Sequence, residues 1–86
     1  MLSDITRGTA VVTGAAQGLG RTFSEALAAS GHAIAMLDVA ECDVTLDAIE
    51  RIGGVGISFV GDAADPADVN AFRDLVRDRL PPVRVL

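Results

Sequence analysis

Short apolar runs alternate along the chain with longer stretches in which apolar residues recur at helical spacing. The runs at 9–13, 33–37 and 55–60 are rich in small and β-branched residues and are bounded by glycine or aspartate. Runs of this kind are typical of buried parallel strands. A similar run begins at 83–86 after two prolines, so we expect a fourth strand there.

The stretches between these runs have the periodicity of helices. The first helix is expected to end at Gly31, which suits the position after a helix C-cap. A second, shorter helix is expected within 39–54, with Asp43 or Thr45 as its N-cap. The third is expected to begin at Asp65, which is followed by proline and a further acid. The predicted apolar faces are Leu19, Phe23 and Leu27 in the first helix, Leu46, Ile49 and Ile52 in the second, and Val69, Phe72, Val76 and Leu80 in the third.

The resulting order, β-α-β-α-β-α-β, predicts an α/β fold. Because a helix follows each of the first three strands, we expect parallel strands joined by right-handed crossovers. This is the N-terminal half of a Rossmann-like doubly wound parallel sheet, with the strands in the spatial order 3-2-1-4. The 86 residues (1–86) are expected to form the N-terminal part of a single domain, since a typical domain has about 100–150 residues.

Composition and charge exclude several classes of protein. Half of the residues are hydrophobic and 22% are charged, which is not the composition of a disordered chain. Seven basic residues against twelve acidic ones give a net charge of −5, which argues against a nucleic-acid or anionic-membrane partner. The single cysteine cannot form an internal disulfide, and neither a leader at the first four residues nor a membrane-spanning run is predicted. We therefore expect a cytoplasmic protein.

A glycine-rich turn joins the first predicted strand to the first predicted helix. Gly14 would let the chain leave the strand in a tight turn, and Gly18 would let backbone N–H groups approach a pyrophosphate. Gly20 would allow close packing between helix and strand. The free N–H groups at the start of the helix add partial positive charge, so the turn predicts a dinucleotide site.

An acidic residue completes this prediction. Asp38 ends the second strand, 18 residues after Gly20, where a carboxylate can accept hydrogen bonds from the ribose hydroxyls of an adenine nucleotide. The same carboxylate would repel a 2′-phosphate. Neither Gln17 nor Val39 offers the basic side chain that NADP would need, so the predicted cofactor is NAD.

These residues resemble the short-chain dehydrogenase/reductase family. The segment 13–20 reads Thr-Gly-Ala-Ala-Gln-Gly-Leu-Gly and matches the family's Thr-Gly-x-x-x-Gly-x-Gly signature, and Asp38 matches its NAD-selecting acid. Asp62 matches the family aspartate that contacts the adenine ring, although a plain turn residue is nearly as good an interpretation. The strand at 83–86 resembles the one that leads into the family's Asn-Asn-Ala-Gly stretch, so the resemblance covers about the first third of a family member. The cofactor contacts it implies are Gly14, Ala16, Gln17, Gly18, Leu19, Gly20, Asp38, Val39, Asp62 and Ala63.

The family's catalytic residues have no counterpart in these 86 residues. The resemblance implies a Ser and a Tyr-x-x-x-Lys pair, in which the phenol acts as general acid/base. The sequence contains no Tyr and no Lys, and none of its serines occupies the corresponding place. We therefore predict no catalytic residue here and an inactive chain on its own. The complete protein is expected to be an NAD-dependent oxidoreductase of alcohols and ketones, and the resemblance implies a homo-oligomer.

Two other interpretations remain open. One is a non-catalytic dinucleotide-binding module, either alone or as a half-domain paired with another chain. The apolar edge strand at 83–86 favours a fragment over a module that stands alone. The other is a methyltransferase-type nucleoside site, which also has an acid after the second strand.

Three remaining features predict no chemistry. His32 is expected to be a surface or loop histidine. Cys42 is expected to be an unreactive thiol, because Glu41 and Asp43 disfavour its thiolate. The acids at 38, 41, 43, 47 and 50 do not have the spacing of a calcium loop, so no metal site is predicted.

Overall fold

The computed structural model describes residues 7–85, and within them every predicted helix and strand is present. The predicted absence of a leader at the first four residues and the assignment of Leu86 to a strand lie outside the described residues. No helix within 7–85 is long and apolar enough to cross a bilayer. The elements are β1 (Thr9–Thr13), α1 (Gly18–Ala29), β2 (Ala33–Asp38), α2 (Asp43–Arg51), β3 (Gly56–Val60), α3 (Pro66–Arg79) and β4 (Val83–Val85).

The four strands form one parallel sheet in the order β3-β2-β1-β4. This order confirms the predicted Rossmann-like doubly wound arrangement. In the register of the sheet, Thr13 pairs with Leu37 and Asp38 pairs with Val60. The carboxyl ends of β1, β2 and β3 therefore lie side by side, at the edge where open parallel α/β sheets bind their ligands.

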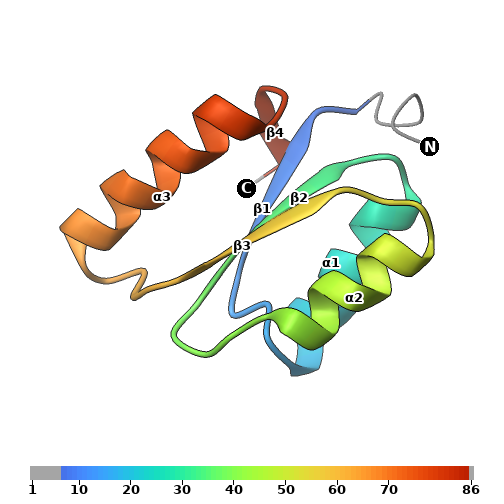
Figure 1. Cartoon of the computed structure of the whole chain (residues 1–86), viewed down its shortest axis with the longest axis horizontal. Helices are drawn as coiled ribbons and strands as arrows, with labels where there is room; N and C mark the ends of the chain where they lie inside the picture. Colours follow the sequence, from blue (N-terminus) through green and yellow to red (C-terminus); the bar gives the residue numbers. More distant parts are fainter. Residues whose placement is uncertain (1–6, 86) are drawn as a thin grey trace.

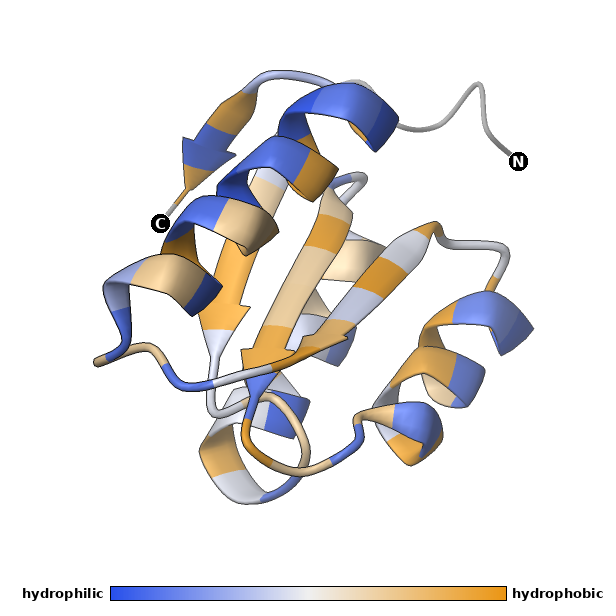
Figure 2. Ribbon diagram, turned by 60° about the vertical axis from the view of Figure 1, so that its left-hand side comes forward, coloured by the Kyte–Doolittle hydropathy of each residue, from blue (hydrophilic) through white to orange (hydrophobic). Residues whose placement is uncertain are grey.

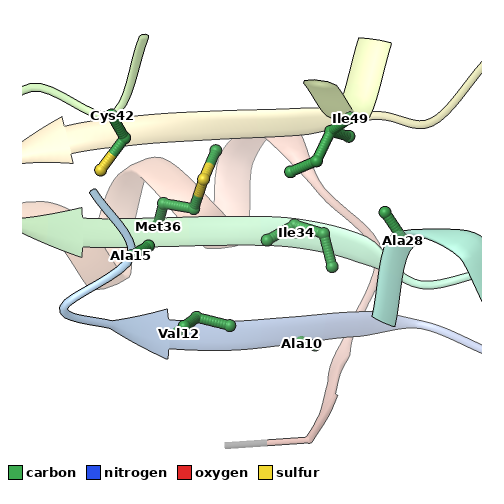
Figure 3. Packing of buried hydrophobic residues seen from close by; sticks show 8 residues of the cluster. All are labelled: Ala10, Val12, Ala15, Ala28, Ile34, Met36, Cys42 and Ile49. Atoms are coloured by element: carbon green, nitrogen blue, oxygen red, sulfur yellow. The ribbon is translucent and has the colours of Figure 1, made fainter. Parts of the chain in front are cut away.

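Helices cover both faces of the sheet, but unequally. Helices α1 and α2 lie on one face and α3 lies on the other (Figure 1). Strands β1, β2 and β3 carry mostly apolar or neutral residues, whereas β4 and each helix carry both apolar and hydrophilic residues (Figure 2). The face under α1 and α2 holds the larger buried cluster (Figure 3), which consists of Ala10, Val12, Ala15, Ala28, Ile34, Met36, Cys42 and Ile49.

The face under α3 is less well filled. Its buried cluster consists of Ala35 and Leu37 from β2 with Phe72 and Val76 from α3. Beside it lies a cavity of about 780 Å³ between α3, β1 and the start of β4. We call this cavity the α3 groove; its lining includes Val11, Leu37, Phe72, Val76, Leu80 and Val83.

The predicted helix faces are wrong in part. Leu19 and Phe23 of α1 are 72% and 55% exposed, whereas the small residues Ser24 and Ala28 of the same helix are buried. A helix that packs closely on a sheet turns its small residues inward, and spacing alone does not show which way an apolar stripe points. Ile52 and Val69 are exposed as well.

Two further expectations are corrected. The N-cap of α2 is Cys42, which makes no side-chain capping bond, so neither Asp43 nor Thr45 caps this helix. His32 lies in a loop but is buried rather than on the surface, with Nδ1 3.3 Å from the carbonyl oxygen of Leu27. The C-terminal turn of α1 therefore covers the imidazole.

Candidate nucleotide-binding site

The turn after β1 depends on two glycines with left-handed backbone conformations. Gly14 has a φ of 68° and Gly18 a φ of 61°, a region that side-chain-bearing residues rarely adopt. A Cβ added at either position would meet no atom within 4 Å. Conformation rather than crowding within the chain therefore requires glycine here, and the space beside Gly18 stays open to a ligand.

Gly20 is required for a different reason. A Cβ at this position would overlap the carbonyl oxygen of Gly14 and lie 3.1 Å from Cα of Ala15. The start of α1 thus packs directly on the loop that leaves β1. The close packing predicted for Gly20 is present, and its nearest contacts are to the loop rather than to the strand itself.

The N-terminus of α1 leaves its backbone donors available. The N-cap, Gln17, is extended and makes no side-chain capping bond, and the first turn contains no acidic residue. In α3, by contrast, the Asp65 side chain caps the helix by accepting a hydrogen bond from the N–H of Ala67. The first N–H groups of a helix have no partner within it, so those of α1 can bind an anion.

Asp38 lies directly beside this turn. Its Oδ2 accepts a hydrogen bond from the N–H of Ala16 at 3.0 Å, and its Oδ1 accepts one from the N–H of Ala40 at 2.9 Å. The bonds from Ala40 and then Ala16 stabilise the charged form, so the pKa of Asp38 is lowered from its ordinary value of 3.8, although partial burial opposes the shift. Asp38 therefore carries a full negative charge at neutral pH.

The turn is also tied to α2 and β2. The hydroxyl of Thr45 donates to the carbonyl of Ala15 at 2.8 Å, and the N–H of Gly14 donates to the carbonyl of Leu37 at 2.9 Å. The bond of Thr45 was not predicted from the sequence, because its partner is 30 residues away and no local spacing indicates it.

The turn after β3 reaches the same edge of the sheet. The N–H of Gly61 donates to the carbonyl of Asp38 at 2.9 Å. Oδ1 of Asp62 accepts from the N–H of Ala64 at 2.8 Å, while the N–H of Asp62 donates to Asp68 at 2.9 Å. Asp62 thus stabilises the turn, which agrees with its interpretation as a turn residue. Its side chain is also exposed.

The structure brings some of the predicted site residues into contact and leaves others as an exposed rim. The N–H of Ala16 donates to Asp38, and the carbonyl oxygen of Gly14 lies where a Cβ at Gly20 would have to be. The exposed predicted residues around this edge are Gln17, Leu19, Val39, Asp62 and Ala63. The arrangement offers backbone donors on one side and a carboxylate on the other, which suits a ligand with both anionic and hydroxyl groups.

Cys42 is buried near this edge and adds no nucleophile. Burial raises the pKa of its thiol, and the carboxylates of Asp38 and Asp43 raise it further. The thiolate is disfavoured as predicted, but the acids responsible are Asp38 and then Asp43, and Glu41 is not among them. Across residues 7–85, no three His, Cys, Asp or Glu side chains are grouped to hold a metal ion.

A parallel sheet with a glycine-rich turn and an acid at the next strand end defines the class of dinucleotide-binding α/β units. Within that class the chain belongs to the short chain dehydrogenase family, whose model matches residues 8–86. This confirms the resemblance carried by the segment 13–20 and by Asp38.

Three known proteins are similar to this chain in sequence or in fold. It is 36% identical over 80 residues to the uncharacterized oxidoreductase YxbG of Bacillus subtilis (strain 168), covering 91% of this chain and 29% of that protein. It is 38% identical over 81 residues to 1-deoxy-11-beta-hydroxypentalenate dehydrogenase of Streptomyces avermitilis, covering 91% and 30%. The crystal structure of carveol dehydrogenase from Mycobacterium avium in complex with NAD superposes with a TM-score of 0.77 at 21% identity, covering 86% and 32%. The chain thus spans less than a third of the length of each of these proteins.

Proposed function

We propose that this chain is the NAD-binding part of a short-chain oxidoreductase that transfers hydride between NAD and an alcohol or ketone. The observation that carries the proposal is the contact between the glycine-rich turn and the Asp38 carboxylate at the carboxyl edge of the sheet. Family membership and the named dehydrogenase relative support the reaction class. The NAD in the carveol dehydrogenase structure supports the cofactor class.

Each part of the site has a role in this proposal. The N–H groups at the start of α1 bind the pyrophosphate, with Gly18 leaving room for its approach. Asp38 accepts hydrogen bonds from the adenosine ribose. Asp62 and Ala63, exposed after β3, contact the adenine ring, and the exposed Gln17, Leu19 and Val39 complete the contacts. When bound, NAD supplies the hydride acceptor.

The charge of Asp38 favours NAD over NADP. Because its pKa is lowered, the carboxylate is ionised at neutral pH and would repel the 2′-phosphate of NADP. Neither Gln17 nor Val39 can supply a compensating positive charge.

We further propose that hydride transfer needs residues outside these 86. General acid/base catalysis by the family's Tyr and Lys is impossible here, because the sequence contains neither residue type. The chain on its own is therefore proposed to bind NAD without turning over substrate. For the complete protein we propose a homo-oligomer in the cytoplasm, the latter because the single buried cysteine suits a reducing compartment.

A second candidate function is a non-catalytic NAD-binding half that pairs with a separate chain. The α3 groove is compatible with it, because such a partner would cover this apolar cavity of about 780 Å³ beside the edge strand β4, as the rest of a longer chain would. The two candidates agree on the nucleotide site and differ in where the catalytic residues reside. Adding a separately purified partner chain to this chain would produce turnover only if the second candidate function is correct.

The cofactor assignment is tested by comparing Asp38→Asn with the unchanged chain in calorimetric titrations of NAD and NADP. Asparagine removes the charge but keeps an acceptor oxygen, so NAD should bind about tenfold more weakly and the preference over NADP should disappear. The matched control is Asp47→Asn, because Asp47 is exposed on α2 and forms no ion pair with any residue in 7–85. An equal loss for both nucleotides would refute the role of Asp38. Binding of S-adenosylmethionine in place of NAD would instead support a methyltransferase-type site.

A further inference from the structure

We propose that Thr45 is a positioning residue for the cofactor-binding turn, acting from α2 by fixing the peptide group between Ala15 and Ala16. The part of this inference that concerns NAD affinity rests on the proposed function. The part that concerns the order of the turn does not.

The hydrogen bond of Thr45 is buried at both ends. Thr45 and Ala15 are both 0% exposed, and the hydroxyl lies 2.8 Å from the carbonyl oxygen. A buried carbonyl that loses its donor has no water to replace it, which makes the bond costly to remove. The bond also joins two elements that are 30 residues apart in sequence.

Other helical hydroxyls in this chain behave differently. In α1, Thr22 and Ser24 donate to carbonyls four residues earlier in the same helix, those of Gly18 and Gly20. That is the usual local bond of a serine or threonine within a helix. Thr45 lies in the first turn of α2, where no helical carbonyl precedes it by four residues, so its hydroxyl reaches the turn instead.

The carbonyl that Thr45 binds and the N–H that Asp38 binds belong to one peptide group. Thr45 holds the C=O of Ala15, and Asp38 holds the N–H of Ala16. A peptide group is planar, and its C=O and N–H point in opposite directions. Two side chains therefore hold one plane from opposite sides, and rotation of this plane would break both bonds together.

This arrangement couples the turn to the ribose-binding carboxylate. An ionised carboxylate has about four acceptor positions, and the bonds from Ala16 and Ala40 take one on each oxygen of Asp38. The backbone N–H of Val39 also interacts with this carboxylate, so at least one of the four positions is left for a ribose hydroxyl. Thr45 thus stabilises the orientation of Asp38 without contacting the nucleotide, and it holds the chain that leads into Gln17 and α1.

The test is Thr45→Val, which keeps the shape of the side chain and removes its hydroxyl. NAD should bind about tenfold more weakly, which corresponds to about 1.4 kcal/mol for an unpaired buried carbonyl. By NMR, the N–H of Ala16 should exchange with solvent at least about tenfold faster, a readout that needs no nucleotide. Thr45→Ser keeps the hydroxyl and should restore both properties.

The control is Ser30→Ala, which removes an exposed hydroxyl that bonds the carbonyl of Ala26 at the far end of α1 from the turn. Unchanged exchange at Ala16 together with unchanged NAD affinity in Thr45→Val would overturn the proposal, even if stability fell. If Thr45→Val does not fold, Thr45→Ser is used for the test. Faster exchange of the Ala16 N–H in Thr45→Ser, or a loss of its NAD affinity greater than about threefold, would also overturn the proposal. If the unchanged chain binds no NAD, the proposed function fails, while the exchange measurement still tests the role of Thr45.

Discussion

Asp38 accepts hydrogen bonds from backbone N–H groups on two different loops, at Ala16 and at Ala40. Both bonds form best with the ionised carboxylate, so they lower its pKa and tie part of the native structure to its charge. We therefore expect Asp38 both to select the cofactor and to stabilise the turn that binds it.

The lowered pKa of Asp38 predicts a specific dependence of stability on pH. A folded pKa below the unfolded value of about 3.8 gives stability that is present above pH 4 and is lost as the pH falls through the folded pKa. The unfolding free energies of the unchanged chain and Asp38→Asn should therefore differ most at neutral pH and converge in acid. Urea unfolding at a series of pH values measures this difference. A difference that stays constant from pH 7 to pH 2 would contradict the prediction.

At the residue scale, the sequence predicted those residues whose role is set by their neighbours in the chain. The glycines of the turn belong to one contiguous motif, and Asp38 follows directly from the end of a strand. Thr45 was wrongly proposed as an N-cap, and His32 lies in a loop as expected but is buried, because the surroundings of both come from other elements. The partner of Thr45 is 30 residues away, and the burial of His32 depends on the turn at the end of α1.

Helices α1 and α3 begin in opposite ways. Helix α3 is capped by its own Asp65 and starts with proline, so its first turn is satisfied locally. Helix α1 has no side-chain cap, which leaves donors for a ligand at some cost in stability. The start of α3 is thus satisfied by its own side chain, whereas the start of α1 keeps the donors that the proposed function assigns to the pyrophosphate.

The cap of α3 can be measured directly. Asp65→Ala removes the acceptor for the N–H of Ala67 and should lower the free energy of unfolding by about 1 kcal/mol, within the usual range for N-caps. The control is Asp78→Ala, which removes an exposed acid from the last turn of α3, where the helix dipole disfavours negative charge. Urea unfolding should show a loss for the first variant and no loss for the second. A loss of equal size in both would show that overall charge, rather than capping, determines the effect.

At the element scale, the spacing of apolar residues predicted which segments are helical but not which side faces the sheet. In α1 the small residues Ser24 and Ala28 face inward, and the larger Leu19 and Phe23 face outward. Close approach of a helix to a sheet depends on side-chain size, which an apolar pattern does not record. The start of α3, by contrast, was predictable because a capping aspartate followed by proline is a local signal.

At the scale of the whole described chain, a parallel sheet has two helices on one face and one helix on the other (Figure 1). Strand order was predictable because alternating strands and helices with right-handed crossovers allow few arrangements. The α3 groove was not, because its lining comes from β1, β2, α3 and β4 together. Two helices contribute to the buried cluster on one face, whereas α3 alone covers the other.

This asymmetry predicts that equal truncations on the two faces of the sheet have unequal effects. Ile34 of β2 is 0% exposed under α1 and α2, whereas Ile57 of β3 is half-buried on the α3 face. Ile34→Val should therefore cost about 1 kcal/mol in the free energy of unfolding, because it leaves a cavity in a closely packed layer. Ile57→Val removes the same methyl group and should cost less than about half as much. Urea unfolding of the two variants measures both costs, and the comparison requires that the variants have equal m-values. Equal costs would mean that the α3 face is as tightly packed as the other, and the groove would then offer little to a partner chain.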